Sequence, residues 1–410
     1  MSIDPHLSST AGIEALKKVY RDGLLNDTLP FWIKHSVDRK YGGFTICLDR
    51  DGTVIDTDKG IWSQGRFTWL LSTIYSEVEK NPEWLELAKH GIDFIRKYGF
   101  DDDGRMFFSV TQSGKPLRKR RYIFSESFTV AAFAAYAKAS GDAQAKEDAL
   151  SVFRLMQRHL SEPGLLPPKL IPETRSMKGL AVPMIMIVTA QILREVLDDP
   201  QELNQVIDDS ISEIEQDFMK PEFKAVLESV APNGDFSDHF DGRMLCPGHA
   251  IEAAWFILKE SVYRNHDSRL RQLGLTILDW MLEWGWDQEY GGILYYRDVK
   301  GLPVQEYWQD MKFWWPHNEA IIATLLAWQL TGDEKYSRWH TQVHDWAYEY
   351  FADPEHGEWF GYLHRDGRVS VPIKGNLWKG PFHFPRMQLV CWQLLQEALG
   401  QANGSGQVPR

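Results

Sequence analysis

Histidines beside carboxylates are the residues of this 410-residue chain best suited to chemistry. In the segment CPGHAIEAAW, His249 and Glu252 stand three residues apart at the start of an apolar run with helical spacing. Residues at that spacing share one face of a helix, and a buried titratable pair makes acid–base catalysis possible. A His and a Glu that only cap the helix would give the same local pattern. Two further segments, 314–320 and 382–386, each place a His among aromatic residues beside a Pro, which favours the catalytic interpretation.

Several His, nearby carboxylates and an Arg, with no activated Ser or Cys, indicate proton transfer. Imidazole is the side chain best matched to a general base at neutral pH. Removing the proton beside a sugar carbonyl creates an enediolate, whose oxygen needs a fixed cation or hydrogen-bond donor. Arg66 can supply that charge from an apolar segment between Trp62 and Trp69. A structural Arg that stacks on Trp and pairs with a Glu explains its position equally well.

Other chemistries fit the sequence less well. An HExxH metal motif, a Walker A loop and a dinucleotide fingerprint are all absent from the sequence, so we expect no metal site. His340 and His344 are four residues apart, but we expect them on the surface of a Tyr- and Trp-rich helix. A glycosidase with paired carboxylates remains an alternative that leaves the His-aromatic segments unexplained; its candidates are Asp49, Asp58, Glu252 and Glu319.

Composition limits the class of protein. With 43% hydrophobic and 25% charged residues, the chain is typical of a soluble globular protein. The 17 Trp residues suit either a cavity that stacks on sugar rings or the packing between helices. A formal net charge of −12 argues against nucleic acid as the main partner, and the basic run 115–121 is interpreted as a solvated loop. Three cysteines without a CxxC pair, no signal-peptide stretch and no membrane-length run predict a cytoplasmic protein.

A repeated turn signature predicts the fold. Asp- and Gly-rich turns begin at residues 38, 102, 163, 233, 287 and 353, and the interval suits two helices and a loop with a hairpin. We therefore expect an all-α fold, a single (α/α)6 barrel with short β-hairpin loops, over residues 1–400, and a flexible tail over 401–410. Apolar periodicity predicts twelve helices, over 13–25, 61–78, 84–98, 124–140, 145–159, 182–197, 205–218, 249–264, 270–284, 317–330, 336–350 and 384–399.

The segments with unusual chemistry recur at one phase of this repeat, where one helix of each hairpin begins. In a barrel of this kind alternate helices form the inner ring, and the loops at one end frame a funnel. We therefore expect these segments to face one cavity. They are 61–66, 122–126, 247–252, 312–319 and 379–386.

At these residues the chain resembles the N-acylglucosamine 2-epimerase family, the renin-binding-protein type of sugar epimerase. The resemblance runs from the YGGF turn at Tyr41 to the end of the chain's last aromatic segment. The matching blocks, in order, are IWSQGR, IFSES, LAVPM, CPGHAIEAAW, MKFWWPHNEA, DPEHGEWFGYL and KGPFHFPR. The resemblance implies an (α/α)6 barrel that interconverts N-acetylglucosamine and N-acetylmannosamine.

The resemblance also implies roles for single residues. His249 and His383 would be the acid–base pair at C2, Arg66 would stabilise the enediolate, and Glu252 and Glu319 would orient the His or open the sugar ring. The expected substrate contacts are Trp62, His317, Lys312, Tyr122 and Arg386. The family requires no cofactor for the chemistry; ATP is an activator, whose site we cannot place because the sequence has no phosphate loop. A homodimer and an amino sugar are the expected partners, without nucleic acid or membrane.

The choice of sugar depends on one helix. Members that act on cellobiose or mannose carry a further His on a middle helix, where this chain has the apolar segment 180–186, and have Gln where this chain has His317. A small apolar wall suits an acetamido methyl group, so we favour the N-acetyl substrate. Pro381 and Phe384 depart from the usual block and leave the fine shape of the substrate open. The alternatives are a 2-epimerase or aldose–ketose isomerase for an unmodified sugar, and a non-catalytic protein-binding role.

Overall fold

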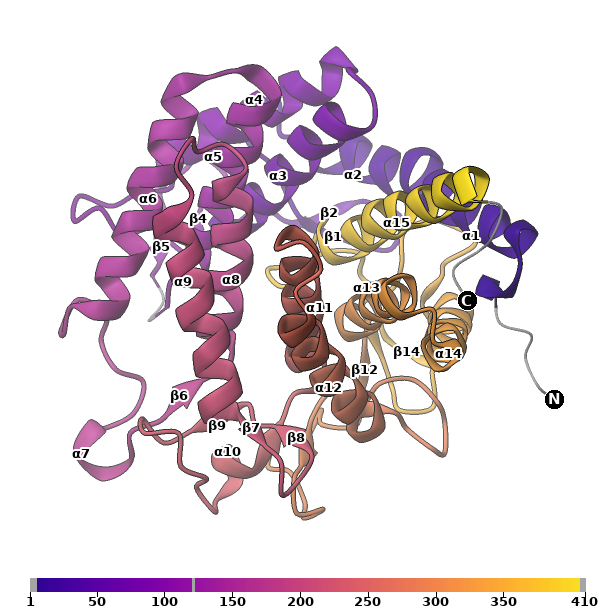
Figure 1. Cartoon of the computed structure of the whole chain (residues 1–410). Coiled ribbons are helices and arrows are strands. Elements are labelled where there is room, and N and C mark those ends of the chain that lie inside the picture. Colours follow the sequence, from indigo (N-terminus) through magenta and orange to yellow (C-terminus); the bar gives the residue numbers. More distant parts are fainter. Residues whose placement is uncertain (1–5, 120–121, 406–410) are drawn as a thin grey trace.

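The structure is a computed structural model that describes residues 6–119 and 122–405. Within these residues, two concentric rings of six long helices form the molecule (Figure 1). The inner ring is α3 (Ile61–Glu77), α5 (Phe124–Ser140), α8 (Ala181–Arg194), α11 (Pro247–Tyr263), α13 (Trp314–Thr331) and α15 (His383–Ser405). Each inner helix contacts the next, and α15 contacts α3, so the ring closes.

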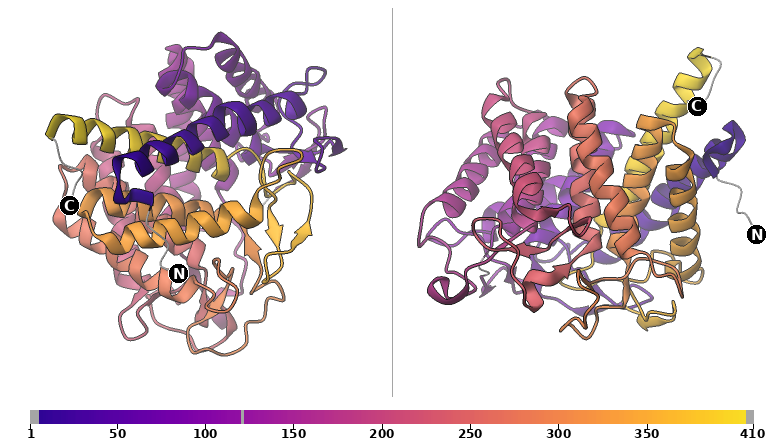
Figure 2. Two further views of the ribbon diagram at one scale, coloured as in Figure 1. Left: turned by 90° about the vertical axis from the view of Figure 1, so that its right-hand side faces the viewer. Right: turned by 60° about the horizontal axis from the view of Figure 1, so that its bottom comes forward.

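Each inner helix packs against an outer helix. The outer ring is α4 (Pro82–Tyr98), α6 (Ala143–Ser161), α9 (Gln201–Glu213), α12 (Ser268–Gly285), α14 (Glu334–Phe351), and the N-terminal pair α1 (Thr10–Gly23) and α2 (Leu29–Ser36). A π-helical turn, Leu24–Thr28, joins α1 to α2, so the predicted first helix is longer than its apolar pattern indicates. The first and last helices, α1 and α15, lie side by side and complete the sixth pair (Figure 2). With α1, the π-helical turn and α2 counted as one continuous helix, the described residues contain the twelve predicted helices.

Burial patterns distinguish the two rings. The inner helix α5 is buried at every position from 125 to 137, whereas α4 is buried along one stripe. A helix that is apolar on all sides must lie inside, and an amphipathic one covers the outside. Two of the tight hairpin turns, at Gly141 and Gly332, end the inner helix with a left-handed Gly, and an Asp then caps the outer helix.

Short strands fix the N-terminal ends of the inner helices. The strand before an inner helix pairs with the strand after the outer helix of the same pair, and these strands and loops lie at one end of the barrel (Figure 2). The pairs are β3 (Lys59–Gly60) with β4 (Ser109–Val110), β6 (Lys178–Gly179) with β9 (Ser229–Val230), β10 (Met244–Leu245) with β11 (Arg297–Asp298), and β12 (Lys312–Phe313) with β13 (Tyr362–Leu363).

Backbone bonds of Leu48 with Lys374 and Gly375 repeat this arrangement before α15. Leu48 belongs to β1 (Cys47–Leu48), which forms a hairpin with β2 (Val54–Asp56). The remaining small elements are β5 (Pro116–Arg118), β7 (Met219–Lys220), β8 (Ala225–Val226), β14 (Val369–Val371), α7 (Pro172–Arg175), α10 (Phe240–Arg243), a 3-10 turn His6–Ser8 and a π-helical turn Ile214–Phe218.

The repeated Asp–Gly signature forms the same ion-paired turn three times. In each copy the Asp carboxylate accepts a backbone N–H from its own turn and pairs with a buried Lys in the segment that leads to the next inner helix. Burial disfavours the charged form of Asp287, yet the hydrogen bonds from Arg365 and Lys312 hold its pKa well below the usual range. The pairs are Asp38–Lys59 at 2.7 Å, Asp287–Lys312 at 2.9 Å and Asp353–Lys374 at 2.8 Å.

Three expectations about the periphery are revised. Helix α15 continues to Ser405, into the predicted tail; residues 406–410 lie outside the described residues. Residues 115–118 of the basic run form part of an exposed hairpin, while 120 and 121 lie outside the described residues. His340 and His344 are buried, against the surface prediction, because they face inward from α14 and bond to Tyr20 of α1. Among the described residues, no helix is long and apolar enough to cross a membrane.

Candidate active site

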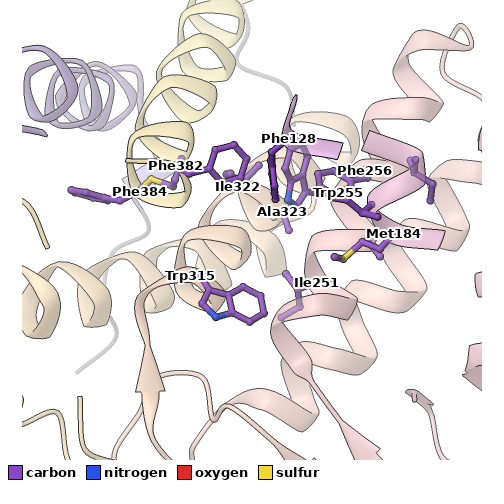
Figure 3. Close-up of a cluster of buried hydrophobic side chains, with 14 of the residues drawn as sticks. Phe128, Met184, Ile251, Trp255, Phe256, Trp315, Ile322, Ala323, Phe382 and Phe384 are labelled. Carbon is purple, nitrogen blue, oxygen red and sulfur yellow. The ribbon is translucent and has the colours of Figure 1, made fainter. Parts of the chain in front are cut away.

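A cavity of about 1350 Å³ occupies the centre of the barrel. All six inner helices contribute to its wall. On α3, α11 and α15 the lining residues recur mainly at intervals of three or four, which is the spacing of one helix face, whereas α13 contributes at its first turn and near its end. Four of the five segments singled out in the sequence reach it with charged, imidazole or phenol side chains, and the fifth with Phe313, Trp314 and Trp315. Figure 3 shows Phe128, Trp255, Trp315 and Phe382 around this central space. The segments therefore meet in one cavity.

His249 lies in the first turn of α11, where Pro247 begins the helix. Its Nδ1 is 3.0 Å from both carboxylate oxygens of Glu228, which leaves Nε2 for a ligand. Burial favours the neutral imidazole, but the adjacent Cys246 sulfur and the Glu228 carboxylate favour the imidazolium and raise the pKa of His249 well above its usual value. The surroundings of His249 therefore favour its imidazolium form.

Glu228 is a site residue that the sequence interpretation missed. It stands between β8 and β9, 21 residues before His249. Its backbone N–H donates to Met244 and its carbonyl accepts from Leu180, so two strands hold it in place. No local periodicity points to it; the only sequence signal is an acidic residue within the apolar run AVLESVA.

His383 is the first residue of α15. Its Nδ1 lies 2.7 Å from Oε1 of Glu319, a fully buried residue in the second turn of α13. Burial and the positive charge of Arg386 hold the pKa of His383 well below its usual value. The neutral imidazole is therefore favoured at His383 and the imidazolium at His249, although each His has a Glu at Nδ1.

Trp315 contacts both imidazoles. Its ring centroid is 4.9 Å from that of His249 and 5.7 Å from that of His383. Helix α13, which carries Trp315, lies between α11 and α15 in the inner ring, so the two His approach the indole from neighbouring helices on either side. Both imidazoles therefore lie beside one indole and line the same cavity.

Charged side chains lie one turn deeper in the barrel. Arg386 donates from Nη2 to Glu252 and to Glu319, each at 2.6 Å, and Trp255 donates to the second oxygen of Glu319 at 2.8 Å. These bonds compensate both buried carboxylates.

Arg66 is held by aromatic faces. Its guanidinium carbon lies 4.4 Å, 4.1 Å and 4.9 Å from the ring centroids of Trp62, Phe128 and Phe382. Its Nε has no hydrogen-bond partner among the described residues, and Nη1 reaches only the Trp378 carbonyl at 3.5 Å. Burial lowers the pKa of Arg66 to about 9. The stacking expected of a structural Arg is present, but Arg66 also lines the cavity, where a guanidinium can stabilise an oxyanion.

Comparison with known proteins decides the family. The family model described as N-acylglucosamine 2-epimerase (GlcNAc 2-epimerase) matches residues 42–382. The chain belongs to this family. N-acylglucosamine 2-epimerase from Bos taurus is 35% identical over 387 residues, with 92% of this chain and 90% of the relative covered. The human enzyme of the same name is 33% identical over 388 residues, with the same coverage.

Solved structures share the fold of this family member. A cellobiose 2-epimerase from Bacillus thermoamylovorans matches with a TM-score of 0.80 at 22% identity, covering 94% of this chain and all (100%) of that one. A D-mannose isomerase matches with a TM-score of 0.78 at 18% identity, covering 97% and 100%. The predicted (α/α)6 barrel is confirmed, and the expected activity is confirmed at the level of a sugar 2-epimerase.

Two of the expected substrate contacts lie outside the cavity of this epimerase. His317 is fully buried, donates from Nδ1 to the Phe313 carbonyl at 2.7 Å and accepts the Ile293 N–H at Nε2 at 2.8 Å. Burial lowers its pKa to about 3. Lys312 is fully buried in the Asp287 pair, as its equivalents Lys59 and Lys374 are in theirs. The prediction that these two residues contact substrate is wrong, because both side chains are engaged behind the wall. Trp62, Tyr122 and Arg386 do line the cavity.

The four carboxylates considered for a glycosidase do not form a catalytic pair in the cavity. Asp49 is exposed and Asp58 half-buried in the rim region, and neither lines the cavity. Glu252 and Glu319 share Arg386 instead of facing each other across a sugar. A family 76 glycoside hydrolase matches the fold with a TM-score of 0.64 at only 10% identity, which is a likeness of fold alone.

Side chains of the types that bind metal ions cluster around each of the two His. Donor atoms of Glu228, Cys246 and His249 lie within 4.8 Å of one another, as do those of Glu252, Glu319 and His383. In both groups the carboxylate oxygens already accept hydrogen bonds from His or Arg. A cation would have to displace these bonds, so the donor sets fit acid–base pairs better than a metal.

Proposed function

We propose that this epimerase interconverts N-acetyl-D-glucosamine and N-acetyl-D-mannosamine by moving the proton at C2 through an enediolate. One observation carries the proposal. Two His–Glu pairs flank Trp315, and their surroundings drive the protonation of the two imidazoles in opposite directions. A two-base epimerisation needs one neutral and one protonated imidazole at the start of each turnover.

The protonation states assign the first roles. Neutral His383 takes the C2 proton through Nε2, and Glu319 at its Nδ1 stabilises the imidazolium that forms. Protonated His249 delivers a proton to the opposite face of C2 while Glu228 holds its ring. After one turnover the two states are reversed, which is the arrangement that the reverse reaction requires; exchange with solvent restores the starting state.

Residues one turn deeper in the barrel than the two His are placed to stabilise the charge that develops on the substrate. Once the sugar ring is open, loss of the C2 proton places negative charge on the C1 oxygen. Arg66 lines the cavity with a guanidinium held between aromatic rings, so it is the donor that we assign to this oxygen. Glu252 also lines the cavity and is placed to handle the proton of the ring oxygen or to orient hydroxyl groups.

The N-acetyl substrate is favoured by the wall on α8. Ala181, Met184 and Ile185 line the cavity there without a titratable group. Such a wall suits the acetamido methyl group, whereas an additional hydroxyl there would lose its hydrogen bonds. The relatives named N-acylglucosamine 2-epimerase are also 33–35% identical, against 22–24% for those named cellobiose 2-epimerase.

Three further traits are proposed from the family resemblance. The chemistry needs no cofactor, ATP activates the enzyme without being consumed, and the enzyme acts as a cytoplasmic homodimer whose single barrel domain spans residues 1–400. Release of ADP in step with product would contradict the role of ATP. Sedimentation of the purified chain as a monomer at assay concentration would contradict the dimer.

A sugar panel tests the proposal. The enzyme is incubated with N-acetylglucosamine, N-acetylmannosamine, glucose, mannose and cellobiose, and the products are separated by chromatography. We expect the two N-acetyl sugars to interconvert with a kcat/KM far above that of any unmodified sugar. Turnover of mannose or cellobiose with no turnover of the N-acetyl sugars would contradict the proposal and support the alternative enzyme.

A further inference from the structure

Two His and one Asp come together on the outside of the barrel, where the N-terminal 3-10 turn packs against α14. A donor atom of each of His6, His344 and Asp345 lies within 4.8 Å of those of the other two. His6 and Asp345 are 339 positions apart in the chain, so no local sequence pattern points to this group. The group is separate from the central cavity, whose described lining includes none of the three residues.

Hydrogen bonds around Tyr20 define which nitrogen of His344 is available to a ligand. His340 Nδ1 lies 3.1 Å from the Ile321 carbonyl oxygen, which can only accept, so this nitrogen carries the proton. Burial favours a neutral imidazole, and Nε2 of His340 therefore accepts from the Tyr20 hydroxyl at 3.1 Å. Because the hydroxyl proton is used in this bond, the Tyr20 oxygen accepts from Nδ1 of His344 at 2.9 Å. The lone pair of His344 is thus on Nε2.

This arrangement is typical of a metal-binding His. Such a His donates its other ring N–H to a fixed acceptor, which orients the ring toward the cation. Tyr20 is that acceptor, and it is itself fully buried and held by two imidazoles. The imidazole of His344 is therefore oriented before any ligand binds.

The backbone of the N-terminal turn is held in place at His6. The His6 N–H donates to Oγ1 of Thr341 on α14 at 3.0 Å, and the next residue, Leu7, is buried. On the other side, the His6 carbonyl approaches α1 so closely that a Cβ at Gly12 would lie 2.2 Å from its oxygen. His6 is therefore a ligand whose backbone is fixed against two helices.

Asp345 completes the group and leaves it open to solvent. Its Oδ1 is 2.7 Å from Nε2 of His6, and the Asp345 and His6 side chains are 39% and 36% exposed. An ion pair with this exposure contributes little to stability, so a cation can displace it. The His–Glu pairs of the active site are more buried, and their bonds are therefore costlier to displace.

We propose that His6, His344 and Asp345 bind one divalent cation of the zinc type, which fastens the N-terminal turn to α14. Imidazole and carboxylate are ligands that Zn²⁺ binds, and three protein ligands leave its fourth position to water. The three ligands meet only in the folded chain, so the cation stabilises the folded state. It does so without contacting the residues that line the cavity.

Titration of the purified, untagged full-length enzyme with Zn²⁺ tests the proposal. The enzyme is first freed of metal with a chelator, and binding is followed by calorimetry. We expect one Zn²⁺ per chain, and a melting temperature that rises by roughly 2–3 °C when free Zn²⁺ exceeds its Kd a hundredfold. His6→Ala and Asp345→Asn should each weaken binding by at least about tenfold, while kcat of epimerisation stays at the wild-type value.

His364→Ala is the matched control, because His364 is also exposed and belongs to no such group among the described residues. This variant should bind Zn²⁺ as the wild type does. Wild-type enzyme that binds no Zn²⁺ would overturn the proposal, and so would binding that both His6→Ala and Asp345→Asn leave unchanged. Zn²⁺ that still binds these two variants and stops epimerisation would place the cation at His249 or His383 and would equally overturn the proposal.

Discussion

Glu228 offers the sharpest test of how the site sets its protonation states. The carboxylate is 3.0 Å from His249 Nδ1 and favours the imidazolium. Glu228→Gln keeps the size of the side chain and removes the charge. A hydrogen bond to a charged group contributes about 1.5–3 kcal/mol, and the loss of such a bond at the transition state corresponds to roughly 10- to 100-fold in kcat.

The sign of the pH effect follows from the same contact. His249 acts as the acid in its protonated form, and its folded-state pKa is raised. Without the Glu228 charge the pKa falls, so the imidazolium is lost at lower pH and the alkaline limb of kcat/KM moves to lower pH. A residue that is merely structural would change stability or KM and leave this limb in place.

The assay is a pH profile of epimerisation in both directions for wild type, Glu228→Gln, Glu228→Asp and Glu222→Gln. Glu222 is the matched control, because it stands exposed in the same hairpin region. Glu228→Asp should recover part of the alkaline limb. A Glu228→Gln enzyme with wild-type kcat and an unmoved limb would refute the reasoning.

Four other substitutions separate catalytic from structural roles. His249→Asn and His383→Asn should each lower kcat by roughly 10²–10⁴-fold with an unchanged circular dichroism spectrum, and near-normal turnover of both would remove the acid–base assignment. Arg66→Lys keeps a charge but loses the planar guanidinium, so kcat should fall much more than KM rises; a change in KM alone would make Arg66 a binding residue. His317→Ala leaves the Ile293 N–H without its acceptor and should lower the free energy of unfolding by roughly 2–4 kcal/mol, measured by urea titration, with kcat per folded enzyme preserved. Loss of kcat without loss of stability would restore His317 to the site.

The barrel could be predicted because each of its repeats carries a signature within a short stretch of sequence. The turns at Asp38, Asp287 and Asp353 are built alike, and each Asp pairs with an equivalent Lys. Similar residues therefore recur at the same position of the repeat. The start of an inner helix is equally visible in the sequence, since an apolar run at helical spacing begins there. Side chains on these first turns must point to the barrel axis, which is why the segments of His249 and His383 meet.

Residues that flank these positions were misassigned for a geometrical reason. In α13, His317 is two residues beyond Trp315, and two steps of about 100° place it on the other side of the helix. Glu319, four residues beyond Trp315, returns to the cavity side and reaches His383. In β12, Lys312 precedes Phe313, and neighbouring strand residues point to opposite faces. Periodicity, applied residue by residue, would have separated these roles.

The role of Glu228 could not be predicted from sequence periodicity. Its contact with His249 depends on the pairing of β6 with β9 and on the bond of its N–H to Met244, which bring separate segments together. The burial of His340 and His344 also depends on a distant partner, since Tyr20 of α1 supplies the hydroxyl that both rings contact. Such contacts are fixed by tertiary structure, and one sequence does not contain them as a local pattern.

The central claim is that two His exchange protons with opposite faces of C2. The most direct measurement is epimerisation of N-acetylglucosamine in D₂O, with the position of deuterium in the product read by NMR. We expect deuterium at C2 of N-acetylmannosamine and none at C3, because the proton delivered by His249 comes from a group that exchanges with solvent. His383→Asn should slow C2 exchange from one epimer far more than from the other. N-acetylmannosamine that retains the original C2 hydrogen in D₂O would contradict the two-base mechanism.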